Sequence, residues 1–347
     1  DEIIPQDLSI RLPEKPVTDV ITMDKYAAKG AQYFKKDGFK LDENLKTLKK
    51  EVEGRAESFN ITVASEIMAI LCLAKDINDL RSRVDNLILA YTYDEKVITV
   101  KDLGITGSVL VLLKDAMKPN LVQTLENNPI LVHGGPFANI AHGCNSIIAT
   151  RLGLKLADYL VTEAGFGADL GAEKFLDIKC REANLNPSAV VLVATIKALK
   201  YHGGVDAKEC KLPNLEALKK GIVNLEKHID TLQKFGLPFV IALNRFDTDT
   251  LEELEYMDSW AKENSYPLAL SEVFSKGGLG GLELAEKVIE TCEKENDFTF
   301  SYDVEESIEN KIRAIVKSAI IASLRNVCAL VKQVLGKGYL FGLYIHF

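Results

Sequence analysis

Short apolar runs alternate with amphipathic helical patterns between residues 58 and 312. Four of these runs are continuous and rich in β-branched side chains, which is typical of strands buried on both faces of a sheet. Residues 214–235 repeat apolar side chains at helical spacing, which predicts an amphipathic helix. This alternation predicts an α/β fold: a mostly parallel sheet wrapped by helices, with ligands at the carboxyl ends of its strands. The predicted strands lie at residues 129–132, 159–162, 189–194 and 238–243.

The two ends of the chain differ in character from this central stretch. Residues 1–57 are polar and rich in lysine, and they contain one amphipathic helical pattern at 42–53. Residues 312–335 predict a single helix, and the apolar residues after it are too few to span a bilayer. We therefore predict a divergent N-terminal segment, an α/β core, a smaller second α/β subdomain and a divergent apolar tail. Their bounds, in chain order, are 1–57, 58–235, 236–312 and 313–347.

Charge and cysteine content argue against several classes of protein. The 347 residues carry a formal net charge of -8 and a pI of about 5.4, so the basic footprint of a nucleic-acid-binding protein is missing. The six cysteines include no CxxC pair, which argues against a zinc site or a disulfide framework. Cys72 lies in an apolar run, as expected of a free thiol in a reducing compartment. We expect a cytoplasmic protein with no bound metal, no nucleic-acid partner and no membrane span.

The segment after the predicted strand at 129–132 combines glycines with polar side chains. It reads His-Gly-Gly-Pro-Phe-Ala-Asn-Ile-Ala-His-Gly over residues 133–143. The glycines let a backbone approach a ligand closely, and His133, Asn139 and His142 offer directional hydrogen bonds. A tight turn with two hydrogen-bonded histidines explains the same residues. The segment is therefore a candidate phosphate, nucleotide or cation loop with a structural alternative.

A second candidate loop, residues 163–173, follows the predicted strand at 159–162. Its glycine-rich turn leads into a helix start, a geometry that suits phosphate. The three carboxylates of the loop would repel a bare anion and would suit a cation or an amine instead. Asp169 has the further alternative of capping the helix together with Glu173.

Two more candidate loops follow the last two predicted strands. In the first, Thr195 begins a stretch in which Lys197, Lys200 and His202 either hold an anion or form a solvated helix face. The second begins at Asn244 and reads Asn-Arg-Phe-Asp, which superficially matches the base-reading loop of GTP-binding proteins. A GTPase also needs Gly-x-x-x-x-Gly-Lys-Ser/Thr, and this pattern occurs nowhere in the sequence. A GTPase-like switch is therefore the weakest of the functional hypotheses.

Taken together, the loops are more specific than any one of them. Residues 193–204 read Val-Ala-Thr-Ile-Lys-Ala-Leu-Lys-Tyr-His-Gly-Gly, and residues 118–126 read Lys-Pro-Asn-Leu-Val-Gln-Thr-Leu-Glu. These runs resemble signature segments of formate–tetrahydrofolate ligases, and the resemblance extends over about residues 58–312. The other segments that carry it, in matching order and spacing, are 60–66, 133–146, 162–180 and 242–249.

The resemblance implies an enzyme that makes 10-formyltetrahydrofolate from formate, tetrahydrofolate and ATP. In that family formate attacks the γ-phosphate of ATP to give formyl phosphate. The folate amine then attacks the formyl carbon, and phosphate leaves. The resemblance also implies a P-loop-type α/β core with smaller domains, a homo-oligomer that is usually a tetramer, and a monovalent cation that aids activity. ATP and tetrahydrofolate are the expected small-molecule substrates.

The resemblance also implies where folate binds. An aromatic slot suits the flat pterin ring, because aromatic faces stack. Phe274 stands where the family usually has tryptophan, and it keeps the stacking but loses the indole donor. Asp247 stands where proline is usual, which alters the rim of the same pocket. The matching pocket positions are Phe166, Gly171, Phe246, Leu270 and Phe274.

Both ends depart from the family pattern. Residues 1–57 contain neither the Walker-type phosphate loop nor the glycine-rich stretch of the family's N-terminal region. The tail at 313–347 stands in place of the family's C-terminal domain. Two interpretations follow. The chain is a truncated form of an ATP-dependent ligase, or it is a non-catalytic paralogue that binds folate or another partner.

Overall fold

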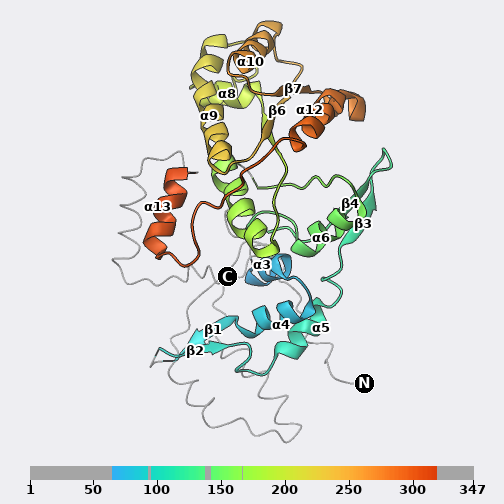
Figure 1. Ribbon diagram of the computed structural model, residues 1–347, viewed down its shortest axis with the longest axis vertical. Coiled ribbons are helices and arrows are strands. Elements are labelled where there is room, and N and C mark those ends of the chain that lie inside the picture. Colours follow the sequence, from blue (N-terminus) through green and yellow to red (C-terminus); the bar gives the residue numbers. More distant parts are fainter. Residues whose placement is uncertain (1–64, 93–94, 137–141, 166, 319–347) are drawn as a thin grey trace, which may run out of the picture. The chain divides into compact units, whose positions relative to one another are not determined.

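The chain folds into two compact units, which we describe separately and label as in Figure 1. The computed structural model describes residues 65–92, 95–136, 142–165 and 167–318. The first unit holds the described residues of 1–120, 132–136 and 145–158. The second unit holds those of 121–131, 137–144 and 159–347.

Helices and a small antiparallel sheet make up the described part of the first unit. Its elements are α3 (Glu66–Leu73), α4 (Ile77–Asp85), β1 (Ile88–Tyr91), β2 (Val97–Thr99), α5 (Thr106–Leu113) and α6 (Ile147–Leu156). Helix α4 begins after Asp76, whose carboxylate accepts the backbone N–H groups of Asn78 and Asp79 and so caps the helix. Leu80 and Val84 lie one turn apart on α4 and are fully buried in the core of this unit. The helix therefore forms from a cap and an apolar stripe.

The predicted strand at 129–132 forms, but it does not join the parallel sheet. It is β4 (Pro129–Val132), which pairs with β3 (Asn120–Gln123) in a separate two-stranded sheet. The Asn128 carbonyl accepts the Thr124 N–H at 2.9 Å in the turn between them, and so short a link makes the pair a hairpin. The predicted placement is therefore wrong. Pairing with the neighbouring strand in the sequence closes only a short loop, which costs little chain entropy.

Three parallel strands form the centre of the second unit, in the order β5–β6–β7. They are β5 (Val190–Ala194), β6 (Phe239–Asn244) and β7 (Leu268–Ser271). Ala194 pairs with Leu243, and Asn244 pairs with Ser271, so the three strands end at almost the same level. The predicted strands at 189–194 and 238–243 are confirmed. The third strand, β7, escaped prediction because it is short and only half of its residues are buried.

Helices cover both faces of the parallel sheet. Figure 1 shows α8, α9 and α10 on one side of the strands and α12 on the other. Their bounds are α8 (Ile196–His202), α9 (Leu215–Lys234), α10 (Leu251–Glu263) and α12 (Leu282–Cys292). Helix α9 confirms the predicted helix at 214–235, and its cap Asn214 accepts the Ala217 N–H at 2.9 Å. The apolar stripe of α9 packs in one core with the strands and with α8 and α10. Its members are Leu218, Ile222, Leu225, Ile229 and Leu232.

Residues 159–162 do not form a strand, so this prediction is wrong. Tyr159 and Val161 are exposed, and no described strand pairs with them. An apolar run becomes a strand only where another strand lies beside it, and this depends on the fold. The chain instead continues into two π-helical turns and a short helix. These are η3 (Gly167–Ala172), η4 (Phe175–Cys180) and α7 (Arg181–Ala183).

The last described elements follow β7. They are α11 (Val273–Lys276), the 3₁₀ turn η5 (Gly277–Gly281), α12 and α13 (Ile308–Ser318). The predicted helix at 312–335 corresponds to α13 in its described part, and the rest of it lies outside the described residues. The predicted helix at 42–53 also lies outside them. Between α12 and α13, Phe298 packs against a small core that includes Leu176 and Phe235.

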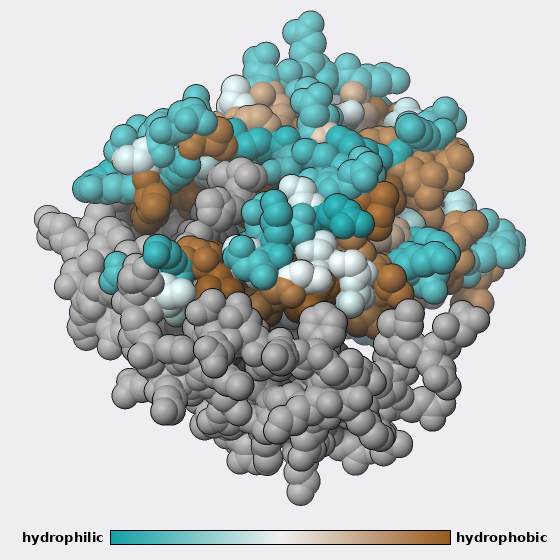
Figure 2. All heavy atoms as spheres, turned by 90° about the horizontal axis from the view of Figure 1, so that it is seen from below, coloured by the Kyte–Doolittle hydropathy of each residue, from teal (hydrophilic) through white to brown (hydrophobic). Residues whose placement is uncertain are grey.

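The surface mixes apolar and polar residues. On the face drawn in Figure 2, hydrophobic residues lie in several patches among hydrophilic ones. No helix in the described ranges is long and apolar enough to cross a membrane. The described cysteines carry free thiols, and those of Cys72, Cys144, Cys180 and Cys210 are buried.

Candidate functional site

The carboxyl ends of β5, β6 and β7 lie at the same edge of the sheet, which brings residues of three loops together. Each strand is followed at once by polar or charged residues, as is typical of ligand sites on parallel sheets. Two phenylalanines lie among these residues with much of their surface exposed. We name the following set the strand-end rim: Lys197, Arg245, Phe246, Glu272 and Phe274.

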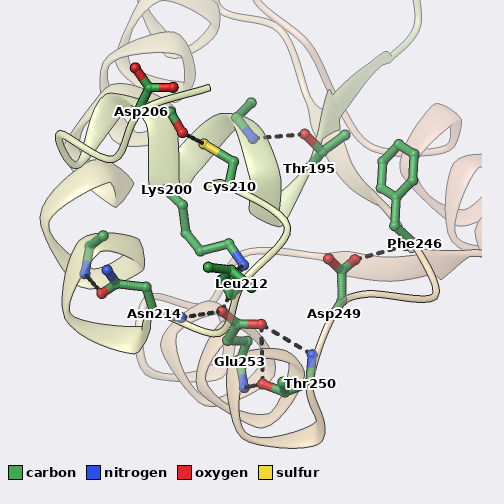
Figure 3. Close-up of polar contacts among 12 residues, drawn as sticks. Thr195, Lys200, Asp206, Cys210, Leu212, Asn214, Phe246, Asp249, Thr250 and Glu253 are labelled. Atoms are coloured by element: carbon green, nitrogen blue, oxygen red, sulfur yellow. Dashed lines mark hydrogen bonds and ion pairs between the residues drawn. The ribbon is translucent and has the colours of Figure 1, made fainter. Parts of the chain in front are cut away.

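Phe246 holds its ring at the rim, and 41% of its surface is exposed. Two hydrogen bonds between Phe246 and Asp249 hold the turn that carries the ring. The Asp249 carboxylate accepts the Phe246 N–H at 2.8 Å (Figure 3), and the Phe246 carbonyl accepts the Asp249 N–H at 2.9 Å. The ammonium of Lys197 lies 3.6 Å from the ring centroid, which is a cation–π contact. The backbone turn at Phe246 is therefore held by two hydrogen bonds, and an ammonium lies near the face of the ring.

Phe274 lies in α11, just after β7, and is fully exposed. The two loops of the rim are joined by Arg245, whose Nη1 donates to Glu272 Oε1 at 2.8 Å. Lys276 donates to the other oxygen of the same carboxylate. These two contacts hold the pKa of Glu272 below its usual range, with the hydrogen bond from Lys276 as the largest cause. Leu270 lies within β7 and is partly buried against the core of the sheet.

The tip of the β3–β4 hairpin reaches the glycine turn that follows Phe274. Glu126 Oε1 accepts the Gly278 N–H at 2.6 Å. A Cβ atom at residue 277 would lie 2.9 Å from this carboxylate, and one at residue 278 would lie 2.6 Å from it. Glycine at both positions therefore allows the carboxylate to approach the backbone. Two segments far apart in sequence meet here beside the strand-end rim.

Lys200, a predicted ligand residue, is instead the centre of a buried network (Figure 3). Its ammonium donates to Glu253 Oε1 and to the Leu212 carbonyl, both at 2.9 Å, and it is fully buried. Glu253 also accepts the Asn214 N–H at 3.0 Å and the Thr250 N–H at 3.1 Å. Burial acts to raise the pKa of Glu253, but these hydrogen bonds outweigh burial and leave the pKa lowered. A ligand could reach Lys200 only by breaking this network.

The other predicted residues after β5 and β6 have visible local roles. The hydroxyl of Thr195 accepts the Ala198 N–H at 3.1 Å and caps α8. His202 is exposed at the last residue of α8, with its ring edge-on to Tyr201. Asn244 is the last residue of β6 and is partly buried at the carboxyl edge. Of these three, only Thr195 and Asn244 lie at the strand ends.

The histidines of the 133–143 loop are buried. His133 lies in the first unit, with Nδ1 2.5 Å from the Ser146 hydroxyl and Nε2 2.6 Å from the Ala116 carbonyl. Because a carbonyl only accepts, Nε2 carries a hydrogen, and in the neutral ring Nδ1 accepts from the Ser146 hydroxyl. His142 belongs to the second unit and is also buried. Asn139 lies outside the described residues. The described contacts of His133 match the structural alternative for this loop.

The 163–173 loop lies against α9. Asp169 Oδ1 is 4.0 Å from His228 Nδ1, and burial lowers the pKa of His228 although Asp169 opposes this. Gly171 is buried, and a Cβ atom there would lie 1.8 Å from the Gly165 carbonyl oxygen. The chain's own close approach therefore requires glycine at this position. Phe166 lies outside the described residues.

Three residues of this region are absent from the candidates that the sequence suggested. Arg245 was visible inside the Asn-Arg-Phe-Asp match, and Glu126 ends one of the signature segments. Glu272 had no signal, because its partner Arg245 is distant in sequence and follows a different strand. Contacts of this kind depend on strand order, which residue spacing does not contain.

A shallow hollow lies at the opposite edge of the sheet. It has a volume of about 470 Å³ and lies at the amino ends of β6 and β7, where Phe239, Asn264, Tyr266 and Lys294 line it. Parallel strands place their amino and carboxyl ends at opposite edges, so this hollow is separate from the strand-end rim. We assign no ligand to it.

The rim can do two things chemically. Its exposed phenylalanine rings can stack on a flat aromatic ligand. Its ammonium and guanidinium groups can attract an anionic group of that ligand. Among the described residues, no cluster of three or more His, Cys, Asp and Glu side chains is placed to hold a metal ion. These properties make the rim a candidate binding site for a flat, partly anionic small molecule.

The chain belongs to a family of ligases. The family model of formate–tetrahydrofolate ligase matches residues 44–335, which is most of the chain. The resemblance seen in the sequence is therefore confirmed. The match also extends beyond residues 58–312 at both ends, into segments that we had predicted to be divergent.

Proposed function

We propose that the strand-end rim binds tetrahydrofolate, with the pterin ring stacked on Phe246 and Phe274. One observation carries the proposal: both rings are exposed and follow adjacent parallel strands, β6 and β7. Phenylalanine is usually a core residue, so two exposed rings at one edge of a sheet are unusual. Leu270 lies in β7, packed against the core of the sheet, and family membership supplies the identity of the ligand.

Lys197 has a defined part in this proposal. Its ammonium now lies 3.6 Å from the Phe246 ring centroid, where a stacked pterin would lie. A ligand on that face would displace the ammonium and exchange one cation–π contact for one ring–ring contact. The displaced ammonium stays tethered to α8 beside the rim, where it can approach an anionic group of the bound ligand.

We further propose that the protein takes part in the reaction of its family, the ATP-dependent formylation of tetrahydrofolate through formyl phosphate. The family match supports this step. In this reaction the protein positions three substrates and stabilises charge as phosphate leaves. The same proposal includes a P-loop-like core, a monovalent cation, a homo-tetramer and a cytoplasmic location.

It also includes the division of the chain into segments 1–57, 58–235, 236–312 and 313–347. Finally, it includes the ligand roles of Phe166, Asp169 and the loop histidines.

Calorimetric titration with tetrahydrofolate tests the folate site. We expect Phe246→Ala and Phe274→Ala each to weaken binding by about 2- to 10-fold, because one ring–ring contact is worth roughly 0.5–1.5 kcal/mol beyond burial. Phe300→Ala is a matched control. Phe300 is 39% exposed, close to Phe246, but its ring packs on Arg181 and Phe298 away from the strand ends.

The control variant should bind as the wild type does. Equal binding by all four proteins, or no binding by the wild type, would remove the basis for a folate site. The formylation step needs a separate assay of 10-formyltetrahydrofolate production by the 347-residue chain. Because this sequence has no Walker loop, we expect little or no turnover even where folate binds. An ordinary turnover rate would show that phosphate is held in another way.

A further inference from the structure

Two carboxyl groups lie buried together beside the turn that contains Gly171. Glu173 and Asp177 are one helical turn apart, and Asp177 is completely buried while Glu173 is 6% exposed. Asp177 Oδ1 has clear partners. It accepts the Ser301 N–H at 2.8 Å and lies 3.6 Å from Arg181 Nη2. These contacts tie the segment before α13 to the π-helical turns.

The second oxygen of Asp177 has no such donor. Oδ2 is buried, and no hydrogen bond from any described residue reaches it. A buried carboxylate oxygen without a donor is costly, so native structures nearly always supply one. Glu173 precedes Asp177 by one turn, and its side chain is close enough to hydrogen-bond to that of Asp177. Two ionised carboxylates cannot form this bond, but one proton between them can.

We propose that Glu173 and Asp177 share a single proton, and that this carboxyl pair is a proton-dependent clamp holding the 298–302 segment against the π-helical turns. In the clamp, the protonated Glu173 carboxyl donates to Asp177 Oδ2, while Oδ1 accepts the Ser301 N–H and forms an ion pair with Arg181. Loss of the proton places two like charges together in a buried site. The clamp then loses its central hydrogen bond.

The electrostatics of the cluster support a retained proton. Burial, with Asp177 as the next cause, raises the pKa of Glu173 to about 8, and burial also raises the pKa of Asp177. Tyr302 faces the pair from the 298–302 segment, and burial raises its pKa to about 12. Both phenol and carboxyl are therefore neutral at pH 7. Coupled groups of this kind titrate as a pair.

Two cations face the same cluster. Lys174 favours the charged form of Glu173, but burial lowers the pKa of Lys174 itself. Arg181 is shared among several contacts: its Nη2 donates to the Tyr302 carbonyl at 2.8 Å, its Nε donates to the Asp177 carbonyl at 3.0 Å, and its guanidinium lies 3.9 Å from the Phe300 ring centroid and near the Asp177 carboxylate. Neither cation compensates fully for the burial of Glu173, whose pKa stays raised.

The sign of the pH dependence follows from these shifts. Above the ordinary glutamate pKa of 4.5, the unfolded chain has lost the Glu173 proton while the folded chain keeps it until about pH 8. The stabilisation is therefore fully present below pH 4.5 and is lost as the pH rises through about 8. Groups whose pKa is lowered in the folded chain, such as Glu253, make stability depend on pH in the opposite direction. Their effect falls at acidic pH.

The test compares the full chain with Glu173→Gln, whose amide donates to Asp177 Oδ2 without titrating. Glu163→Gln is the control, since Glu163 is an exposed carboxylate earlier in the same segment of the sequence. Between pH 5 and 8 we expect the melting temperature of the wild type to fall relative to Glu173→Gln by on the order of 2 °C per pH unit, and the difference to level off above about pH 8. The control should follow the wild type. Parallel profiles for wild type and Glu173→Gln would overturn the proposal.

A second measurement reads the protonation of Glu173 directly. In protein labelled with ¹³C at glutamate carboxyls, the Glu173 resonance, identified by its absence in Glu173→Gln, should titrate near pH 8. Ordinary titration near pH 4.5 would mean that no proton is shared. Both outcomes are independent of folate binding, so failure of the clamp and failure of the folate site are distinguishable.

Discussion

Two lysines of one short helix, α8, show opposite uses of the same side chain. Lys197 lies at the strand-end rim with its ammonium near the ring of Phe246. Lys200, less than one turn further along, is fully buried and bound to Glu253. The first can be displaced by a ligand, whereas the second holds three segments together. A cation near the end of a strand therefore indicates a ligand site only where the fold leaves it accessible.

The surroundings of the two cations differ in the same way. At the rim, charges meet in solvent, where salt screens them and each pair contributes little. In the network around Lys200, the partners are buried and hydrogen-bonded on nearly every side. Removing one partner there leaves the other as an uncompensated buried charge. Three variants test this contrast, in decreasing order of their predicted effect.

Removal of the Lys200 charge should be strongly destabilising. Lys200→Met keeps most of the side-chain volume but leaves the Glu253 carboxylate buried without its cation. We expect a loss of about 3–5 kcal/mol in the free energy of unfolding, as for other broken buried pairs. Urea denaturation measures it. Lys219→Met is the matched control, since Lys219 pairs with Glu216 on the exposed side of α9, and its loss should cost about 0–1 kcal/mol. Equal effects for both variants would contradict the contrast between buried and exposed lysines.

Removal of the rim contact between the two loops should affect stability much less. Arg245→Ala deletes the 2.8 Å bond to Glu272 at a site where Arg245 is exposed. Lys276 remains to pair with the same carboxylate. We expect a change of about 0–1 kcal/mol in the free energy of unfolding, measured by the same denaturation. A loss as large as that of Lys200→Met would show that the rim is structural and would weaken its assignment as a ligand site.

The contact at the hairpin tip should matter least to global stability and should act locally. Glu126→Gln keeps the shape of the side chain but removes the charge that strengthens the bond to Gly278. We expect a change of about 0.5 kcal/mol or less in the free energy of unfolding, together with faster hydrogen exchange of the Gly278 amide. Glu283→Gln, on the exposed Lys287 pair of α12, is the control. Unchanged exchange at Gly278 would mean that the carboxylate does not hold the turn.

Some of the fold followed directly from periodicity. The stripe of α9 and the runs that became β5 and β6 were visible because each contains several consecutive or regularly spaced apolar residues. The runs at 129–132 and 159–162 had the same local composition, yet the first formed a hairpin and the second formed no strand. Strand pairing depends on which segments lie side by side, so equal composition gave different results.

The candidate site shows the same limit. The position of Phe246 in a loop, between Arg245 and Asp247, marks it in the sequence as an unusual phenylalanine. The family resemblance, carried by the order of several loops, was also present in the sequence and is confirmed. The burial of Lys200 was not predictable in this way, because Glu253 lies 53 residues later and reaches it only through the packing of α10 against α9.

The residue pattern was thus enough to determine the family, the main helix of the second unit, two of its three parallel strands and the loop that carries Phe246. Tertiary packing, by contrast, set which charged residues are exposed and which are buried. It made Lys197 a rim residue, Lys200 a structural one, and Glu173 the buried partner of Asp177. The physical reason is that apolar periodicity is a property of neighbouring residues, whereas burial and pairing of charges depend on segments that are distant along the chain.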